Sequence, residues 1–163
     1  MRWLRGSALF ITGTLVGILI MATVASSQKK MTGLTLNHFG IYVKDIDEST
    51  KFYTEKMGFR EAFRFKDGMG NPIVYLQIDK NTFLEMTPAD KDHPAGFSHG
   101  GLLSGDVAAT VADLRKKGLT VEDVHVGGTK ALISNTTDPN GVRMELLTYP
   151  PGSLQRIAMD GWK

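Results

Sequence analysis

The region from His38 to Glu145 consists of one sequence unit that occurs twice, and this repeat constrains the fold more than any other feature. A histidine, an aspartate, a glycine and a glutamate recur in the same order in both copies: His38, Asp45, Gly58 and Glu85, then His99, Asp106, Gly118 and Glu145. Corresponding positions lie 60 or 61 residues apart. Because a repeat of this length folds as copies of one supersecondary unit, we expect two similar modules.

Each copy has the pattern of a βαβββ module. A short apolar run suited to a strand is followed by a helix and then by strand-like segments. Turn signals such as Asp67-Gly68 and Asp138-Pro139-Asn140-Gly141 separate these segments. The predicted fold class is therefore α+β, with modules at about 34–90 and 96–149 and a C-terminal extension at 150–163.

The predicted helix of each copy begins at an aspartate N-cap and ends at a glycine. In the first copy, either Asp45 or Asp47 is the N-cap and Gly58 ends the helix. In the second copy, Asp106 and Gly118 take these places. The residues predicted to form the buried faces are Ile46, Tyr53 and Met57 in the first helix and Val107, Val111 and Leu114 in the second.

The first thirty residues have the pattern of a targeting segment. Two arginines, Arg2 and Arg5, precede an uncharged apolar stretch at 6–25, and a polar linker follows up to residue 30. This stretch suits a cleaved secretory signal, and it is also about long enough to span a bilayer as an uncleaved membrane anchor. Both alternatives predict an extracytoplasmic protein, periplasmic, secreted or anchored, because the arginines stay on the cytoplasmic side.

The two histidines and two glutamates of the repeat form the candidate site. Glu85 and Glu145 each lie among apolar neighbours in a strand-like segment, where a buried carboxylate needs a compensating charge. Taken singly, each glutamate, like His38 or His99, is best explained as an ordinary strand residue facing solvent. Recurrence at matched positions favours another interpretation, in which approximate twofold pairing of the modules brings all four side chains to one divalent metal ion. Such ligands suit Zn, Ni, Co, Mn or Fe(II).

The composition excludes some kinds of site and makes some partners unexpected. The 163 residues contain no cysteine, which excludes disulfides and thiolate metal sites. The net charge is only +2, and lysines and arginines are scattered among acids, so nucleic acid is not an expected partner. The length from 31 to 163 suits a single domain. Of the remaining candidates, His93 and His125 have no counterpart in the other copy. His93 lies in the loop between the copies, whereas His125 is predicted at the surface, with a substrate-facing role as the alternative. Trp162 is predicted to be buried against the sheet, with a place over a pocket as the alternative.

These residues resemble the vicinal oxygen chelate superfamily, which includes glyoxalase I, extradiol dioxygenases, methylmalonyl-CoA epimerase and bleomycin-resistance proteins. The resemblance covers about Leu36 to Tyr149. It rests on these motifs: His38 followed by Ile41-Tyr42-Val43-Lys44-Asp45, the stretch from Ser49 to Tyr53, Met57-Gly58-Phe59, His99, and Asp138-Pro139-Asn140-Gly141-Val142-Arg143-Met144-Glu145. It implies a half-open mixed β-barrel around the metal and a small-molecule substrate. The modules could pair within one chain or between the chains of a homodimer.

Within that superfamily, the set of four ligands resembles bacterial glyoxalase I rather than enzymes with two histidines and one carboxylate. This implies a lyase or isomerase that moves a proton next to a chelated carbonyl or diol, with Glu85 or Glu145 as the base. Glyoxalase I enzymes that use glutathione usually place an arginine just after the first ligand, but residues 39–43 are uncharged here. The alternatives are an Fe(II) extradiol-type dioxygenase and a non-enzymatic drug- or metabolite-binding protein.

Overall fold

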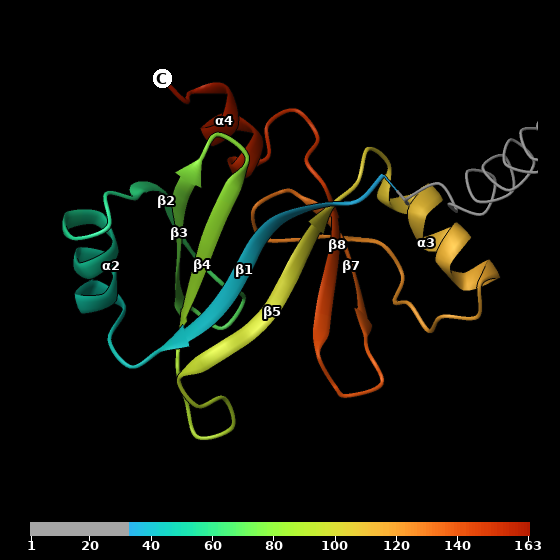
Figure 1. Cartoon of the computed structure of the whole chain (residues 1–163), viewed down its shortest axis with the longest axis horizontal. Coiled ribbons are helices and arrows are strands. Elements are labelled where there is room, and N and C mark those ends of the chain that lie inside the picture. The colour runs from blue at the N-terminus through green and yellow to red at the C-terminus, as the bar shows by residue number, and fades with distance from the viewer. Residues whose placement is uncertain (1–32) are drawn as a thin grey trace, which may run out of the picture. The chain divides into compact units, whose positions relative to one another are not determined.

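The computed structural model describes residues 33–163, and these contain the two predicted βαβββ modules (Figure 1). The first module consists of β1 (Thr35–Val43), α2 (Ile46–Glu55), β2 (Arg60–Lys66), β3 (Pro72–Asp79) and β4 (Thr82–Pro88). The second consists of β5 (Gly96–Leu103), α3 (Val107–Lys116), β6 (His125–Val126), β7 (Leu132–Thr137) and β8 (Arg143–Thr148). A further helix, α4 (Leu154–Asp160), lies in the C-terminal extension. The predicted fold class is confirmed.

Within residues 33–163, eight strands form one mixed sheet in the order β2-β3-β4-β1-β5-β8-β7-β6. The first strands of the two modules, β1 and β5, pair antiparallel at its centre (Figure 1). Each of them also pairs in parallel with the last strand of its own module, β4 or β8. The two modules are therefore arranged with approximate twofold symmetry within one chain, and their curled sheet is the predicted half-open barrel.

The two faces of the sheet carry different side chains because successive residues of a strand point to opposite sides. On β3, Val74 and Leu76 lie in a cluster with residues of α2, whereas Tyr75 belongs to the cluster on the opposite face. On β8, Leu146 packs with α3 and Leu147 packs on the opposite face. Helix α4 contributes to the cluster that contains Tyr75 and Leu147. The face turned away from α2 and α3 is called the inner face below.

The helix boundaries follow the repeated aspartates and glycines. Asp45, not Asp47, is the N-cap of α2, because its carboxylate accepts two backbone N–H groups of the first turn at 2.9 and 2.8 Å. Asp106 caps α3 with one such bond of 3.0 Å. Gly58 and Gly118 follow the helices with φ angles of +75° and +87°, which glycine adopts without steric strain.

The predicted burial of Met57 is wrong. Helix α2 ends at Glu55 and Lys56 is its C-cap, so Met57 lies beyond the helix and is 53% exposed. Tyr53 packs instead against Phe59, with 5.6 Å between the ring centroids. Gly58 does not follow the last helical residue directly, because Lys56 and Met57 form a turn between the end of α2 and this glycine. The residues predicted on the buried face of α3 are all buried.

The predicted signal peptide or membrane anchor at 1–30, with its apolar segment at 6–25, lies outside the described residues. It stays a prediction, which fractionation of cells expressing the full-length chain would test. Within residues 33–163, no helix combines the length and the apolar character needed to cross a membrane.

Candidate metal centre

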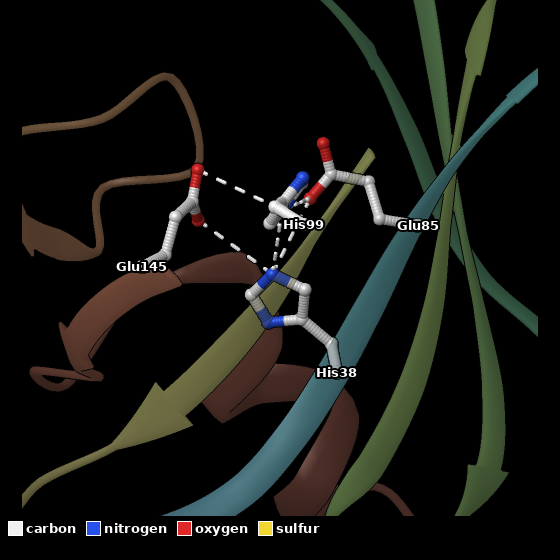
Figure 2. Close-up of side chains that lie close together, drawn as sticks. All are labelled: His38, Glu85, His99 and Glu145. Atoms are coloured by element: carbon white, nitrogen blue, oxygen red, sulfur yellow. Dashed lines mark hydrogen bonds and ion pairs between the residues drawn. The ribbon is translucent and has the colours of Figure 1, made fainter. Parts of the chain in front are cut away.

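The two histidines and two glutamates of the repeat meet on the inner face of the sheet (Figure 2). His38 and His99 come from the central strands β1 and β5, while Glu85 and Glu145 come from β4 and β8 beside them. Both imidazoles are buried, and the carboxylate side chains are only 13% and 12% exposed. One donor atom from each residue lies within 4.8 Å of the other three. One chain thus brings together all four residues that the repeat indicates.

The distances among these donor atoms suit a single ion. Nε2 of His38 lies 3.0 Å from Nε2 of His99. Each of these nitrogens also lies 3.5 to 3.7 Å from a carboxylate oxygen of Glu85 and of Glu145. Ligand atoms about 2.1 Å from a shared ion stand roughly 3.0–3.4 Å apart in octahedral or tetrahedral geometry. The cluster therefore fits a divalent ion after movements of a few tenths of an ångström.

Two glycines leave the space that the imidazole rings occupy. In the antiparallel pair of β1 and β5, His38 lies opposite Gly101 and His99 lies opposite Gly40. A Cβ atom on Gly101 would lie 2.0 Å from Cε1 of His38, and one on Gly40 would lie 2.3 Å from Cε1 of His99. Both distances are far below van der Waals contact. Each histidine is followed two residues later by one of these glycines, so the repeated His-x-Gly pattern is the sequence signal that identifies them.

Hydrogen bonds on the outer nitrogen of each imidazole orient the rings. Nδ1 of His38 lies 3.3 Å from Oδ1 of Asn37, an oxygen that also accepts a hydrogen bond from the Tyr149 hydroxyl. Nδ1 of His99 lies 3.0 Å from the hydroxyl of Ser98 and 2.7 Å from the guanidinium of Arg143. These partners hold each ring with Nε2 toward the centre of the cluster, and the contact of His38 with an acceptor is the one found in known metal sites.

The two carboxylates of the cluster have different partners. Glu85 accepts a hydrogen bond of 2.5 Å from the phenol of Tyr75. Glu145 accepts one of 2.8 Å from the guanidinium of Arg143, which also lies 2.7 Å from Nδ1 of His99. Burial, together with the nearby Glu85, raises the pKa of Tyr75 well above 10, so Tyr75 stays a neutral donor. One carboxylate therefore faces a neutral group and the other faces a cation.

Both carboxyl groups are ionised at neutral pH. Burial alone would raise their pKa values, but the surrounding imidazoles outweigh that effect. For Glu85, the interactions with His99 and His38 bring the pKa below its ordinary value of 4.5. For Glu145, the hydrogen bond with His38 and the electrostatic interactions with His99, His38 and Arg143 lower the pKa to about 2. Two carboxylate oxygens and two imidazole nitrogens form the donor set of a divalent transition metal.

The low pKa of Glu145 predicts acid sensitivity of the metal-free fold. A carboxyl with a folded pKa of about 2 and an ordinary value of 4.5 stabilises the protein by at most about 3 kcal/mol. This contribution is complete above about pH 4.5 and is lost as the pH falls toward about 2. In EDTA, the difference in free energy of unfolding between wild type and Glu145→Gln should therefore shrink from pH 6 to pH 3. Urea titrations at both pH values measure it, and Glu55→Gln, at an exposed position, should show no such convergence.

A cavity of about 210 Å³ opens beside the two carboxylates. Glu85 and Glu145 form part of its wall, so a molecule in the cavity can reach the cluster. The remaining wall combines aromatic and aliphatic side chains with an aspartate and a threonine: Phe65, Ile73, Tyr75 and Ile133, with Asp67 and Thr129.

The other candidate residues lie away from the cluster. His93 is 53% exposed and forms an ion pair of 3.0 Å with Asp90. His125 is exposed on β6. The predicted surface position of His125 and the predicted loop position of His93 are confirmed. Trp162 is only half-buried, with the guanidinium of Arg60 lying 5.3 Å from its ring centroid, so its predicted burial is partly correct.

Several residues around the ligands were not predicted. Asn37 and Ser98 directly precede the two histidines, so a polar residue at matched repeat positions was a usable signal. Arg143 lies on the same face of β8 as Glu145, two residues away. Tyr75 is different, because it meets Glu85 only through the register of β3 and β4. Local sequence carries no signal for such a cross-strand pair.

The sequence matches a known family over most of the described residues. The profile of the glyoxalase/bleomycin resistance protein/dioxygenase superfamily matches residues 35–146. The chain belongs to this superfamily. The match includes all four residues of the cluster, and the resemblance drawn from the repeat is confirmed. The ligand set of two histidines and two glutamates is like that of glyoxalase I.

Individual members of the superfamily show how far the likeness extends. A probable chloroplastic lactoylglutathione lyase of Arabidopsis thaliana is 36% identical over 125 residues, which are 70% of this chain and 35% of that protein. The chain thus spans about a third of the length of this relative. The structure of methylmalonyl-CoA epimerase from Mycobacterium tuberculosis superposes with a TM-score of 0.67 at 21% identity, over 78% of this chain and 96% of that chain. This likeness shows a common fold.

A second solved epimerase is more similar in sequence. Methylmalonyl-CoA epimerase from Streptomyces coelicolor, in a variant form bound to 2-nitronate-propionyl-CoA, is 26% identical with a TM-score of 0.61. The alignment covers 69% of this chain and 95% of that chain. The superfamily members similar to this chain thus include a lyase and an epimerase by name.

Proposed function

We propose that the protein is a metal-dependent lyase or isomerase that moves a proton at a carbon beside a chelated carbonyl or hydroxyl group of a small molecule. The observation that carries this proposal is the position of Glu85, which belongs both to the cluster and to the wall of the cavity. Its carboxylate can therefore reach a metal ion and a bound molecule. The names of the lyase and epimerase relatives support the same class of chemistry.

In this proposal, His38, His99, Glu85 and Glu145 hold one divalent ion, which is Zn, Ni, Co, Mn or Fe(II). When bound, such an ion polarises neighbouring substrate oxygens as a Lewis acid and makes the adjacent C–H bond more acidic. The imidazoles supply neutral ligands whose orientation is set by Asn37 and Ser98.

We assign the role of base to Glu85. The guanidinium of Arg143 stabilises the ionised form of Glu145, because protonation of Glu145 would weaken the charge-assisted hydrogen bond between them. Both carboxylates lie near the two imidazoles, but Glu85 accepts its further hydrogen bond from the neutral phenol of Tyr75, so protonation of Glu85 breaks no interaction with a guanidinium. Glu85 is therefore the carboxylate suited to receive a proton from a molecule in the cavity, and Glu145 is suited to remain anionic.

Glu85→Gln is expected to abolish proton transfer while leaving metal in the protein. Gln keeps an oxygen for the ion but cannot accept a proton, and loss of a general base lowers rates by roughly 10²–10⁴-fold. The measurement is deuterium incorporation from D₂O into dihydroxyacetone, followed by ¹H NMR with the metal-loaded protein. Elemental analysis of the same samples reports the metal content. Glu55→Gln, at an exposed position, is the matched control and should exchange at the wild-type rate.

Two results would contradict this assignment. If Glu85→Gln exchanged deuterium at the wild-type rate with equal metal content, Glu85 would not be the base. A metal-loaded wild type that exchanges no faster than the free metal ion, with dihydroxyacetone, hydroxyacetone and glyceraldehyde alike, would count against proton transfer as the function.

We expect no oxygen uptake when the Fe(II)-loaded protein is mixed with catechols. The non-haem Fe(II) oxygenases use two histidines and one carboxylate, which leaves open positions for both oxygen and substrate. Here a second carboxylate belongs to the cluster and would take up one of those positions on a bound ion. An oxygen electrode gives the measurement, and steady oxygen consumption with any catechol would instead favour the dioxygenase alternative.

A further inference from the structure

The cavity beside Glu85 and Glu145 carries features that define its substrate more narrowly, if the proposed function holds. Its volume of about 210 Å³ lies below the range of about 300–1,000 Å³ for sites that hold drug-sized ligands. A molecule that fits within it has few atoms beyond the two oxygens that reach the cluster. Phe65, Ile73 and Ile133 offer such a molecule an apolar wall.

The charges on the cavity wall are all negative. Its charged residues are Asp67, Glu85 and Glu145, and no lysine, arginine or histidine lines it among residues 33–163. The charges of Glu85 and Glu145 would be balanced by a bound divalent ion. Asp67 would then remain as the uncompensated charge of the wall.

Asp67 is held in place as an anion by its own loop. Its carboxylate accepts hydrogen bonds from the backbone N–H groups of Met69 and Asn71, both at 2.8 Å, and from the Asn71 carboxamide at 3.0 Å. The Asn71 side chain, followed by these backbone groups, lowers the pKa of Asp67. Asp67 is therefore charged at neutral pH.

Asp67 also borders the neighbouring space. A second cavity, of about 240 Å³, is lined by Asp67 together with Asp90 and His93. Any part of a ligand that extends from the first cavity into the second lies close to one or both aspartates. Arg143, which contacts the cluster through Glu145 and His99, lines a different cavity and also donates a hydrogen bond to Asn135.

We propose that the cavity selects small neutral or cationic molecules with two adjacent oxygens, that it disfavours molecules with a carboxylate or phosphate arm, and that Asp67 is the residue that makes this selection. The apolar wall receives a short hydrocarbon group, and the two oxygens face the cluster. An anionic arm would meet the charge of Asp67 in a partly enclosed space, where repulsion over several ångströms weakens binding by about tenfold.

Three hydroxamates that share the same two-methylene chain test the proposal without requiring turnover. Each binds a metal through two adjacent oxygens, and they differ only in the group at the far end: butyrohydroxamate is neutral, β-alanine hydroxamate is cationic and succinic acid monohydroxamate is anionic. Their dissociation constants are measured from the visible absorption of the Co(II)-loaded protein. The anionic compound should bind about tenfold more weakly than the neutral one, and the cationic compound at least as tightly.

Asp67→Asn should bring the anionic and neutral compounds within about threefold of each other. Asp138→Asn is the matched control, because Asp138 holds the corresponding turn of the second module through similar bonds with Asn140 and Val142 but does not line the cavity. It should keep the wild-type preference. Raising NaCl from 0.05 to 0.5 M should shrink the preference in wild type, which tests the charge effect without any substitution.

Equal binding of the anionic and neutral hydroxamates by wild type would overturn the proposal, and so would an unchanged preference in Asp67→Asn. These results are independent of proton transfer. If the protein shows the predicted preference among the hydroxamates but exchanges no protons, the proposed selection by Asp67 is supported and the proposed reaction is wrong.

Discussion

His99→Ala should purify with less than a tenth of the metal of the wild-type protein. His99 is nearly fully buried, and its Nε2 lies 3.0 Å from that of His38 and 3.5 Å from Glu85. Loss of a group that merely supports a ligand already weakens metal binding by about 10–100-fold, so loss of the ligand itself should exceed that range. Proton exchange should fall with the metal content. Elemental analysis of protein dialysed against a chelating resin gives the result.

The other histidines of the chain provide the controls. His93→Ala and His125→Ala remove exposed imidazoles and should leave metal content and exchange rate unchanged. Far-ultraviolet circular dichroism of each variant shows whether the sheet is retained. A folded His99→Ala protein with the same metal content as wild type would show that His99 and its cluster do not bind the metal.

Gly101→Ala should also empty the metal centre, although it removes no ligand. The new methyl group would lie 2.0 Å from Cε1 and 2.1 Å from Nδ1 of His38, whose ring is fully buried. The ring must then leave the position in which Nε2 faces the cluster. Overpacking of this kind destabilises a protein by about 1–3 kcal/mol. We therefore expect metal binding at least about 100-fold weaker, measured by competition with a chromogenic chelator, together with a lower free energy of unfolding in EDTA.

Gly105→Ala is the matched control for this substitution. A Cβ atom on Gly105 meets no atom within 4 Å, and its φ angle is not in the left-handed region. This variant should bind metal and unfold as wild type does. Gly40→Ala should reproduce the defect through His99, because the two glycines have equivalent places in the repeat. Wild-type metal affinity in folded Gly101→Ala would show that the close approach of ring and glycine is not needed.

The metal cluster could be predicted from the sequence because the chain repeats itself. A lone His38 or Glu85 has several ordinary explanations, but a matched pair at the same spacing implies equivalent places in two modules. The helix N-caps and the glycines after the helices were also predictable, since capping depends on residues within one turn. The wrong prediction for Met57 also has a local origin, because local patterns locate the end of a helix only within a few residues.

Other features depend on contacts that no local pattern encodes. The antiparallel register of β1 and β5 places each histidine over the glycine of the other module, and the register of β3 and β4 places Tyr75 beside Glu85. The neutral hydrogen-bond donor of Glu85 therefore comes from a neighbouring strand and not from its own segment of the sequence.

The sequence by itself therefore determined the modules, the helix of each module and the identity of the four clustered side chains, because periodicity and short-range capping act within each copy of the repeat. Only the tertiary structure decided that one chain completes the cluster, that Glu85 and Glu145 have unlike partners, and that Asp67 stands at the cavity wall. The physical reason is that strand register and the curl of the sheet join residues that lie far apart along the chain, and those long-range pairings decide which charges and hydrogen-bond donors surround each group.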